Sequence, residues 1–572
     1  MSGIDWVVLS ITLLTIIGYG IFKSKTSKNL EGYFLSDRNM PWYLILLSIM
    51  GTQASAITFI SAPGQAYTDG MRFVQYYFGL PIAMVLICFT FLPIYHKLKI
   101  FTAYEFLETR FDSKTRGLTT FLFLLQRGLS TGISIYAPSI ILSTLLGWNI
   151  YWTNLFMGGL LIIYTVTGGA KSIAYTQQLQ FFIIFISMLS VGIYVVHLLP
   201  SNVGFIDALK VSGKLGKMNI VTSGFENGKF NFNDRYNIYS GVIGGFFLAL
   251  SYFGADQSQV GRYLTAKNIK ESRLGLLLNG MVKVPMQFLI LLVGVLIFTF
   301  YQFNAPPLFF NKNQIARVEN SIYKDSLNTL RKDFNIINTA KNKLVHQYII
   351  EEKKNQTSSM TIKAIIAENK KAEQIRNDFK NILSNKSIGG DNNDTNYIFL
   401  RFVIDYLPEG LVGLIIAMIF LASWGSIAAA LNSLASCTMV DIHKKFLNKN
   451  CDDLKDYNTA RIYTLGWGIF SIIVAMFSTG MGSLIEAVNI LGSLFYGVIL
   501  GIFLVAFYLK NINGNMVFWS AIFMELVVIL LFWKSNIGFL WMNVIGALGV
   551  IICCCLAKFL SNVLLLKNIS KV

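Results

Sequence analysis

Two basic residues lie inside apolar stretches, and their position is the clearest sign of a functional site in this sequence. Arg127 and Lys283 stand well inside long apolar runs, where an unpaired charge is costly and usually marks a substrate or ion pathway. Each cation therefore needs an anionic partner. For Arg127 the partner is either Asp256 or the carboxylate of a bound solute, and the structural pair with an acidic side chain is the preferred interpretation.

No arrangement of residues suited to enzyme catalysis is found in the sequence. The four histidines are scattered, the six cysteines show no metal-ligand spacing, and no nucleophile and base stand at a working spacing. We therefore predict that the protein is not an enzyme and uses no organic cofactor.

A second kind of chemistry is expected where small, oxygen-bearing residues interrupt an apolar run. The stretch 48–70 is apolar enough for a membrane, yet it is rich in Gly, Ala, Ser, Thr and Pro. Irregular backbone at bilayer depth survives only beside protein or a polar cavity, so this stretch predicts a broken helix whose freed carbonyls hold ions. A continuous helix kinked by glycine for close packing is the alternative interpretation.

Residues 422–443 form a comparable stretch, in which Gly and Ala allow close helix contacts while Ser and Asn supply oxygens. Sodium is a hard cation that prefers oxygen ligands, so a hydroxyl such as that of Ser426 suits it. Small polar residues at this spacing mediate helix packing by default, and both interpretations stay open on this stretch alone.

The composition decides the class of protein. Of the 572 residues, 54% are hydrophobic and 14% are charged, and the mean hydropathy is +0.54. The net charge of +18 comes largely from short loops between apolar runs and from one long polar insert, as membrane orientation requires. We therefore predict an all-α polytopic membrane protein that contacts the lipid bilayer and no nucleic acid. The sequence gives no oligomeric state.

The apolar runs predict about 13 transmembrane helices. Lysines follow the first run, which places the N-terminus outside and the C-terminus in the cytoplasm of a multi-pass protein in the plasma membrane, or in the inner membrane of a bacterium. The predicted spans are 6–22, 48–70, 74–95, 118–147, 151–167, 173–199, 236–257, 274–303, 411–440, 460–480, 484–509, 515–533 and 539–564.

Spans two to six and spans seven to eleven form two groups of five. Each group opens with a Gly-interrupted span, and because five is odd the second group enters the membrane from the opposite side, as in an inverted repeat. The expected segments are a leading helix and cytoplasmic loop at 1–41, the first repeat at 42–199, an external loop at 200–235, the second repeat at 236–302 and 398–509, a long polar external insert at 303–397, and C-terminal helices at 510–572.

The insert at 303–397 departs from the apolar pattern. Two of its stretches show apolar residues at helical spacing among charges, which predicts a small external helical subdomain. A disordered insert is the alternative.

Four motifs, in order along the chain, carry a resemblance to a known family. The stretches SAITFISAPGQAYTDG, GGAKSIAYTQQLQ, SYFGADQSQVGRYLTAK and GSIAAALNSLASCTMVDI resemble the sodium/solute symporter family, which includes sodium-coupled sugar, proline, vitamin, monocarboxylate and iodide transporters. The form of the motifs is closer to the vitamin, monocarboxylate and iodide branch. The resemblance implies a core of two inverted five-helix repeats with broken first and sixth core helices, alternating access, and Na⁺ as the coupling ion.

The same resemblance implies where sodium binds. Its backbone ligands fall on Gly51 and Ala54 in span two and on Ala422 in span nine, and its two hydroxyl positions fall on Gly425 and Ser426. Gly425 offers no hydroxyl, so the sequence departs from the family pattern and leaves one side-chain ligand.

A second departure lies in span six. The family has an acidic residue after a threonine there, whereas in this chain Thr176 is followed by Gln177. A charged residue near the sodium site is therefore lost.

Solute contacts are also implied by the resemblance. Tyr252 matches an aromatic residue that covers the solute from the inside, and Ile57 and Thr58 stand where a sugar transporter carries an acid and a glutamine, which disfavours sugar. The predicted solute-binding or gating residues are Gln53, Thr58, Arg127, Tyr252, Asp256, Gln257 and Lys283.

These observations predict a sodium-coupled secondary active symporter that imports a small organic solute by alternating access, and a carboxylate-bearing solute is one candidate. One alternative is a sodium-coupled sugar or sialic acid symporter. Another is a transceptor or sensor that kept the fold and lost tight sodium coupling, a hypothesis that the departures at Gly425 and Gln177 keep open.

Overall fold

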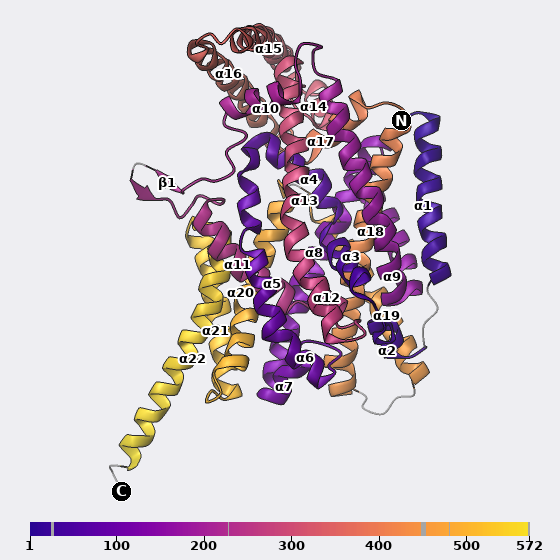
Figure 1. The fold of residues 1–572 in the computed structure, drawn as a ribbon, viewed down its shortest axis with the longest axis vertical. Coiled ribbons are helices and arrows are strands. Elements are labelled where there is room, and N and C mark those ends of the chain that lie inside the picture. Colours follow the sequence, from indigo (N-terminus) through magenta and orange to yellow (C-terminus); the bar gives the residue numbers. More distant parts are fainter. Residues whose placement is uncertain (24–27, 227, 448–452, 480, 570–572) are drawn as a thin grey trace.

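Long helices run side by side through most of this protein (Figure 1). The computed structural model describes residues 1–572 except 24–27, 227, 448–452, 480 and 570–572. Within the described residues, the extended elements are the short antiparallel strands β1 (Phe225–Glu226) and β2 (Lys229–Phe230). The predicted all-α fold class is therefore confirmed.

The helices follow the apolar runs of the sequence, and polar residues cap several of them, as when the Asn268 side chain accepts hydrogen bonds from the N–H groups of Lys270 and Glu271. The helices are α1 (Gly3–Lys23), α2 (Leu30–Leu35), α3 (Trp42–Gln53), α4 (Ala56–Asp69), α5 (Leu80–Phe89), α6 (Phe91–Leu98), α7 (Glu105–Arg110), α8 (Ser113–Leu146), α9 (Ile150–His197), α10 (Phe205–Lys214), α11 (Gly245–Gly254), α12 (Gln257–Tyr263), α13 (Ile269–Phe303), α14 (Lys312–Glu319), α15 (Lys324–Lys353), α16 (Ser359–Leu383), α17 (Thr395–Tyr406), α18 (Leu411–Cys437), α19 (Asp453–Met476), α20 (Leu484–Tyr508), α21 (Gly514–Lys534) and α22 (Phe539–Ile569).

Ten helical stretches of the described residues are long and apolar enough to cross a membrane. Three shorter apolar helices, Trp42–Gln53, Ile150–Val166 and Ser240–Gly254, accompany them. Each of the 13 predicted spans overlaps at least one of these helices, and span two overlaps two of them, Trp42–Gln53 and the start of Ala56–Leu98. The multi-pass architecture is therefore as predicted, and the number of membrane crossings stays a prediction.

Spans five and six form one helical element, α9, with a sharp change of direction at Gly169. This residue has φ +58°, a conformation that glycine adopts without the strain that a side chain brings. A Cβ there would also lie 3.1 Å from the carbonyl oxygen of Tyr33. The glycine thus separates the two spans and lets α2 approach them.

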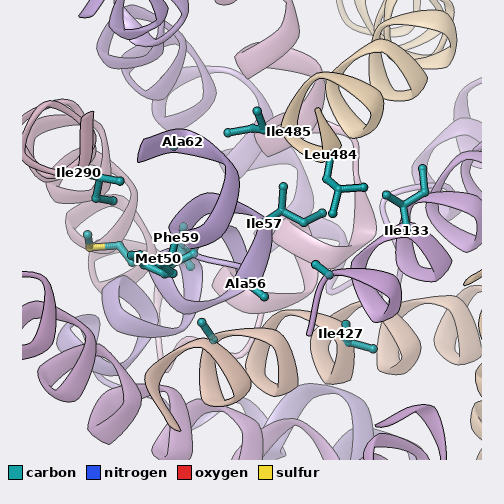
Figure 2. Close-up of a cluster of buried hydrophobic side chains, with 14 of the residues drawn as sticks. Met50, Ala56, Ile57, Phe59, Ala62, Ile133, Ile290, Ile427, Leu484 and Ile485 are labelled. Carbon is teal, nitrogen blue, oxygen red and sulfur yellow. The ribbon is translucent and has the colours of Figure 1, made fainter. Parts of the chain in front are cut away.

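Helix α4 is enclosed by the rest of the bundle. All its residues from Ala56 to Ala66 are buried, and Figure 2 shows apolar side chains of α3, α8, α13, α18 and α20 around it, including Met50, Ile133, Ile290, Ile427, Leu484 and Ile485. A helix surrounded on all sides by protein can tolerate the polar and small residues that this stretch contains, because lipid never reaches them.

The insert contains the helical subdomain that its sequence predicts. α14, α15 and α16 enclose their own apolar core, made by Leu308, Phe309, Val318, Leu327, Phe334, Ala372, Phe379 and Leu383. The alternative of a disordered insert is wrong. Figure 1 places this subdomain and the N-terminus at one end of the molecule, and the C-terminus at the other.

Candidate functional site

The helix of span two is broken after Gln53. Ala54 and Ser55 leave the helical conformation, with ψ of 70° and 167°, so α3 and α4 are separate helices. The Ser55 N–H turns back to the carbonyl oxygen of Gln53, and among the described residues the carbonyl oxygens of Gly51 and Ala54 accept no hydrogen bond. Freed carbonyls of this kind can hold a cation.

The helix of span seven is broken at Ala255 and Asp256, between α11 and α12. Asp256 caps α12, because its carboxylate accepts a hydrogen bond from the Ser258 N–H over 2.7 Å. The break therefore lies after all four glycines that were expected to interrupt this span, Gly241, Gly244, Gly245 and Gly254. Gly241 has a packing role instead, since a Cβ there would lie 2.4 Å from the carbonyl oxygen of Gln75.

A cavity of about 160 Å³ lies beside both breaks. Its lining combines hydroxyl groups, amides and aromatic rings with two cations, and no carboxylate of the described residues lines it. Since a cavity of about 150 Å³ is known to hold benzene, this one suits a small organic solute. The predicted site residues that line it are Gln53, Thr58, Arg127, Tyr252, Lys283 and Ser426.

The charge of Arg127 is met by Asp256. The guanidinium, on α8, forms an ion pair with this carboxylate and donates to the Tyr496 hydroxyl over 2.7 Å. The Tyr496 hydroxyl donates in turn to Asp256 over 2.6 Å. The structure therefore contains the acidic partner that was preferred for Arg127, and this cation needs no solute carboxylate to balance it.

Lys283 has no acidic partner within the part of the chain that the structure describes. It lies on α13, is 1% exposed and lines the cavity. Its ammonium group lies 5.6 Å from the centre of the Tyr77 ring, a cation–π contact. The anionic partner that this residue was expected to need is thus not a protein carboxylate, and the cavity is where an anion can reach it.

Tyr252 lies near the end of α11, and its ring faces the cavity. Its hydroxyl accepts a hydrogen bond from the side-chain amide of Gln259 over 2.7 Å, and the Arg127 guanidinium lies 5.4 Å from the ring centre. The ring therefore contacts two polar groups at the second break, Gln259 of α12 and the Arg127 guanidinium that pairs with Asp256, while its gating role stays a prediction.

The predicted sodium ligands of α18 lie in its buried part. Ser426 is 8% exposed and reaches the cavity lining. Its hydroxyl donates to the carbonyl oxygens of Ala422 and Ser423, at 3.0 Å each, which leaves its oxygen lone pairs free to accept a cation. This hydroxyl and the free carbonyls of Gly51 and Ala54 are the hard oxygen ligands that fit sodium.

Gln177 connects α9 to both helices of the predicted sodium site. Its amide oxygen accepts a hydrogen bond from Ser48 over 2.7 Å, and its amide nitrogen donates to Thr52 and to the carbonyl oxygen of Gly425, over 3.2 and 3.0 Å. The side chain is fully buried. The sequence predicted only the loss of a charge at this position. It did not indicate that the amide side chain makes three hydrogen bonds at once.

Gln257 lies away from the solute cavity. Its amide oxygen accepts a hydrogen bond from the Ala103 N–H over 3.0 Å, and its amide nitrogen donates to the Phe101 carbonyl over 2.8 Å. The side chain thus fastens the segment between α6 and α7 to the start of α12. Contact with the solute, one of its predicted roles, is not part of this geometry.

The cavity also contains polar residues of α8 and α20 that sequence reasoning missed, namely Gln126, Ser130, Thr131, Ser134, Asn489 and Tyr496. On α8 a signal was present, since Gln126, Ser130 and Ser134 recur every four residues and so share one helix face. On α20 nothing in the sequence separates Asn489 from an ordinary packing position. Among the described residues, no group of three or more His, Cys, Asp or Glu side chains could hold a metal ion.

Comparison with known proteins gives this geometry its context. The family model described as "Sodium:solute symporter family" matches residues 33–322 and 370–524. A sodium/sialic acid symporter of Aliivibrio fischeri is 24% identical over 96% of this chain and 92% of its own length. A sodium-dependent multivitamin transporter of Oryctolagus cuniculus is 25% identical over 90% of this chain and 67% of its own length.

A solved structure supports the same fold. The substrate-bound, outward-open structure of a Na⁺-coupled sialic acid symporter matches with a TM-score of 0.74, covering 98% of both chains at 22% identity. The two proteins therefore share their overall arrangement of helices.

Proposed function

Because this chain belongs to the sodium:solute symporter family, we propose that it is a sodium-coupled secondary active symporter that imports a small, carboxylate-bearing organic solute by alternating access. Family membership supports the coupling to Na⁺. The class of solute rests on one observation, the unbalanced charge of Lys283 in the central cavity.

The charges around the cavity favour an anionic solute. Arg127 is balanced by Asp256, whereas Lys283 faces the cavity with an aromatic ring as its neighbour. An isolated ammonium group away from water is strongly unfavourable. A solute carboxylate would remove this cost, whereas a neutral sugar would leave the charge unbalanced.

The hydroxyl groups of the lining suit the second oxygen of a carboxylate or a further polar group of the solute. Thr58 on α4 and Ser130 and Ser134 on α8 supply such groups on the cavity wall. Together with a volume of about 160 Å³, they favour an acid of about the size of benzene.

Sodium would bind between the break in span two, which separates α3 from α4, and the neighbouring helix α18. The carbonyl oxygens of Gly51, Ala54 and Ala422 and the hydroxyl of Ser426 are the proposed ligands, and Gly425 contributes no side-chain oxygen. Because the first two carbonyls belong to the break in span two, a movement of α3 against α18 would couple ion release to the opening of the cavity.

The proposed transport cycle uses the two groups of five spans as inverted repeats, 42–199 and 236–302 with 398–509. We place the protein in the plasma membrane, or in the inner membrane of a bacterium. The N-terminus and the 303–397 insert would lie outside, and the C-terminus would lie in the cytoplasm. The location of the N-terminus and the insert at one end of the molecule supports this orientation.

Sialic acid is a second candidate solute. Two relatives that match 96% of this chain are named as sodium/sialic acid symporters, and sialic acid also carries a carboxylate. The small volume of the cavity is what places smaller acids ahead of it.

Uptake into proteoliposomes under a sodium gradient tests the proposal. The panel contains monocarboxylates, the corresponding neutral amides, amino acids, sugars and sialic acid, each measured with sodium and with potassium. We expect sodium-dependent uptake of a carboxylate. Lys283→Met should weaken its apparent affinity about 10- to 150-fold, as for the loss of a hydrogen bond to a charged group worth about 1.5–3 kcal/mol.

Lys283→Arg keeps the positive charge and is the matched control, from which we expect a smaller loss. A preference for neutral sugars, or equal carboxylate uptake by Lys283→Met and the unchanged protein, would contradict the proposed solute class. Solute binding without sodium-driven uptake of any compound would instead support the sensor hypothesis.

A further inference from the structure

A second polar cavity, of about 520 Å³, lies where the helical insert meets the rest of the protein. Its walls come from the end of α4, the end of α13, and α15 and α16 of the insert, which Figure 1 shows gathered at the end that carries the N-terminus. It shares no lining residue with the central cavity. The matches to the family model leave out residues 323–369, which include α15 and the start of α16, so this cavity is built in part from a segment outside the family pattern.

The insert is fixed against α13 by polar contacts. The Lys341 ammonium donates to the Tyr301 carbonyl oxygen over 3.2 Å, and the Asn369 side chain donates to the Gln302 amide oxygen over 3.1 Å. Apolar residues of α15, among them Val345, also join the main core of the protein. The walls of the cavity are therefore preformed.

The charges that line this cavity are mostly positive. Five cations, Lys217, Lys341, Lys370, Arg376 and Lys380, face three carboxylates, Asp69, Glu373 and Asp394. Arg376 and Asp394 are both buried and form an ion pair at 2.8 Å, and the Asp394 carboxylate also accepts the Phe310 N–H over 2.8 Å. This carboxylate is therefore already occupied and cannot balance another cation.

Lys341 is the buried cation that lacks a balancing charge. It is 3% exposed, and within the described residues no carboxylate lies in ion-pair distance of it. Its ammonium carries three N–H donors, of which one is used by the Tyr301 carbonyl. Burial lowers the pKa of Lys341 to about 8, and the neighbouring Arg376 guanidinium acts in the same direction.

Lys217 adds a second cation to the lining of this cavity. Its ammonium donates to the carbonyl oxygen of Thr68 and lies 4.9 Å from the centre of the Phe298 ring, and no carboxylate of the described residues pairs with it. One turn before Lys341, the Asn338 side-chain amide donates to the Phe334 carbonyl oxygen over 2.8 Å, and its own side-chain oxygen is an acceptor without a partner. The donors that this cavity offers to an anion are therefore the remaining N–H groups of Lys341 and Lys217.

We propose that this cavity is a second binding site of the protein, which takes a small oxyanion, either an organic carboxylate or a phosphate, on the ammonium groups of Lys341 and Lys217. The Arg376–Asp394 pair holds the wall behind it. An oxyanion supplies an acceptor and a negative charge to these two ammonium groups, neither of which has a carboxylate of the described residues within ion-pair distance. The site stands independently of transport through the central cavity.

Thermal unfolding of the purified full-length protein in detergent tests the site. Potassium acetate and potassium phosphate are the two probes, titrated in sodium-free buffer at constant ionic strength, with potassium chloride as the balancing salt. A ligand that binds only the folded protein raises the unfolding temperature in a saturable way. We expect this rise for the unchanged protein, and an apparent affinity at least tenfold weaker for Lys341→Met.

Two matched variants locate the effect. Lys332→Gln removes an exposed lysine from the same helix and should keep the full response. Lys283→Met alters the central cavity and should also keep it, so this experiment can succeed or fail separately from the proposed function. If Lys341→Met does not fold, Lys217→Gln replaces it and should weaken the response in the same way.

Each outcome has a defined meaning. A response to acetate alone identifies the ligand as an organic carboxylate, and a response to phosphate alone identifies it as a phosphate. No response to either probe would overturn the proposal. So would a full response of both the Lys341 and the Lys217 variants, or a response that disappears in Lys283→Met.

Discussion

The side-chain amide of Gln177, on α9, donates a hydrogen bond to the carbonyl oxygen of Gly425, on α18, over 3.0 Å. These are the two positions at which the sequence departs from the family pattern, one by losing an acid and the other by losing a hydroxyl. Because they are in contact, the two departures form one feature. A neutral amide and a backbone carbonyl meet where the pattern has a carboxylate and a hydroxyl, which leaves Ser426 as the proposed side-chain ligand of sodium.

Ser426→Ala should raise the sodium concentration needed for half-maximal transport. The lost ligand is worth about 1–3 kcal/mol in a buried polar site, which corresponds to about 5- to 150-fold in apparent sodium affinity. The measurement is initial uptake against sodium concentration, normalised to protein in the membrane. If Ser426 serves only helix packing, the curve should not move, because alanine is equally small.

Ser436→Ala is the control for the Ser426→Ala variant, since Ser436 is buried on the same helix and does not line the cavity.

Gly425→Ser restores the missing hydroxyl only if its neighbours move. A Cβ at Gly425 would lie 2.5 Å from the side-chain oxygen of Gln180. We therefore expect Gly425→Ser to give no gain in sodium affinity unless Gln180 is shortened as well.

Asp256→Asn should destabilise the protein, because it leaves the Arg127 guanidinium, whose side chain is only 12% exposed, without its counter-charge. Breaking a buried pair in this way costs about 3–5 kcal/mol. The unfolding temperature of the purified protein measures the effect. The double variant Arg127→Met, Asp256→Asn removes both charges and should recover most of the loss. A double variant no more stable than Asp256→Asn would show that the pair is not what holds these helices.

Tyr252→Ala should change the balance between solute exchange and net uptake, because the ring that faces the cavity at the second break would be lost. Tyr252→Phe keeps the ring and loses only the hydrogen bond from Gln259, so its kinetics should stay close to those of the unchanged protein. Both rates are measured in proteoliposomes. Unaltered exchange and uptake in Tyr252→Ala would exclude the gating role.

The predicted orientation can be checked at the loop between α15 and α16. A single cysteine is best placed at Gln356, which is exposed, rather than at Asn355, whose φ of +54° disfavours most side chains. In a background without accessible native cysteines, an impermeant thiol reagent should label this position in intact cells. Labelling only after lysis would place the insert in the cytoplasm.

Lys341 should make stability depend on pH in the alkaline range. Its pKa is about 8 in the folded protein because of burial, and near 10.4 in an unfolded chain. Between these values the unfolded chain holds a proton that the folded protein has lost, so the free energy of unfolding rises with pH. Below pH 8 the buried charge lowers stability by about 3 kcal/mol.

In buffer free of oxyanions, Lys341→Met should therefore unfold at a higher temperature than the unchanged protein at pH 7, and the difference should vanish above pH 10.5. Taking the difference between the two proteins cancels titrations that they share. A difference that is the same at pH 7 and pH 10.5 would show that Lys341 does not titrate in this window.

The long apolar runs determined the helical architecture, because each run can satisfy its backbone within its own helix and needs no distant partner. The sequence also indicated the break in span two. It placed the break of span seven among the glycines, whereas the structure has it at Ala255 and Asp256. Gly241 packs closely against the backbone of Gln75, which is far away in the sequence. A glycine that permits close packing and a glycine that breaks a helix cannot be distinguished in a single sequence.

For the candidate site, the sequence by itself determined that Arg127 and Lys283 are cations inside apolar helices, since burial in such a run follows from local composition. Only the tertiary structure decided that Asp256 balances Arg127 while Lys283 faces a cavity without a carboxylate. Likewise, only the structure brought Gln177 to Gly425. These outcomes depend on contacts between residues more than a hundred positions apart, which follow from how the helices pack and not from the periodicity of any one of them.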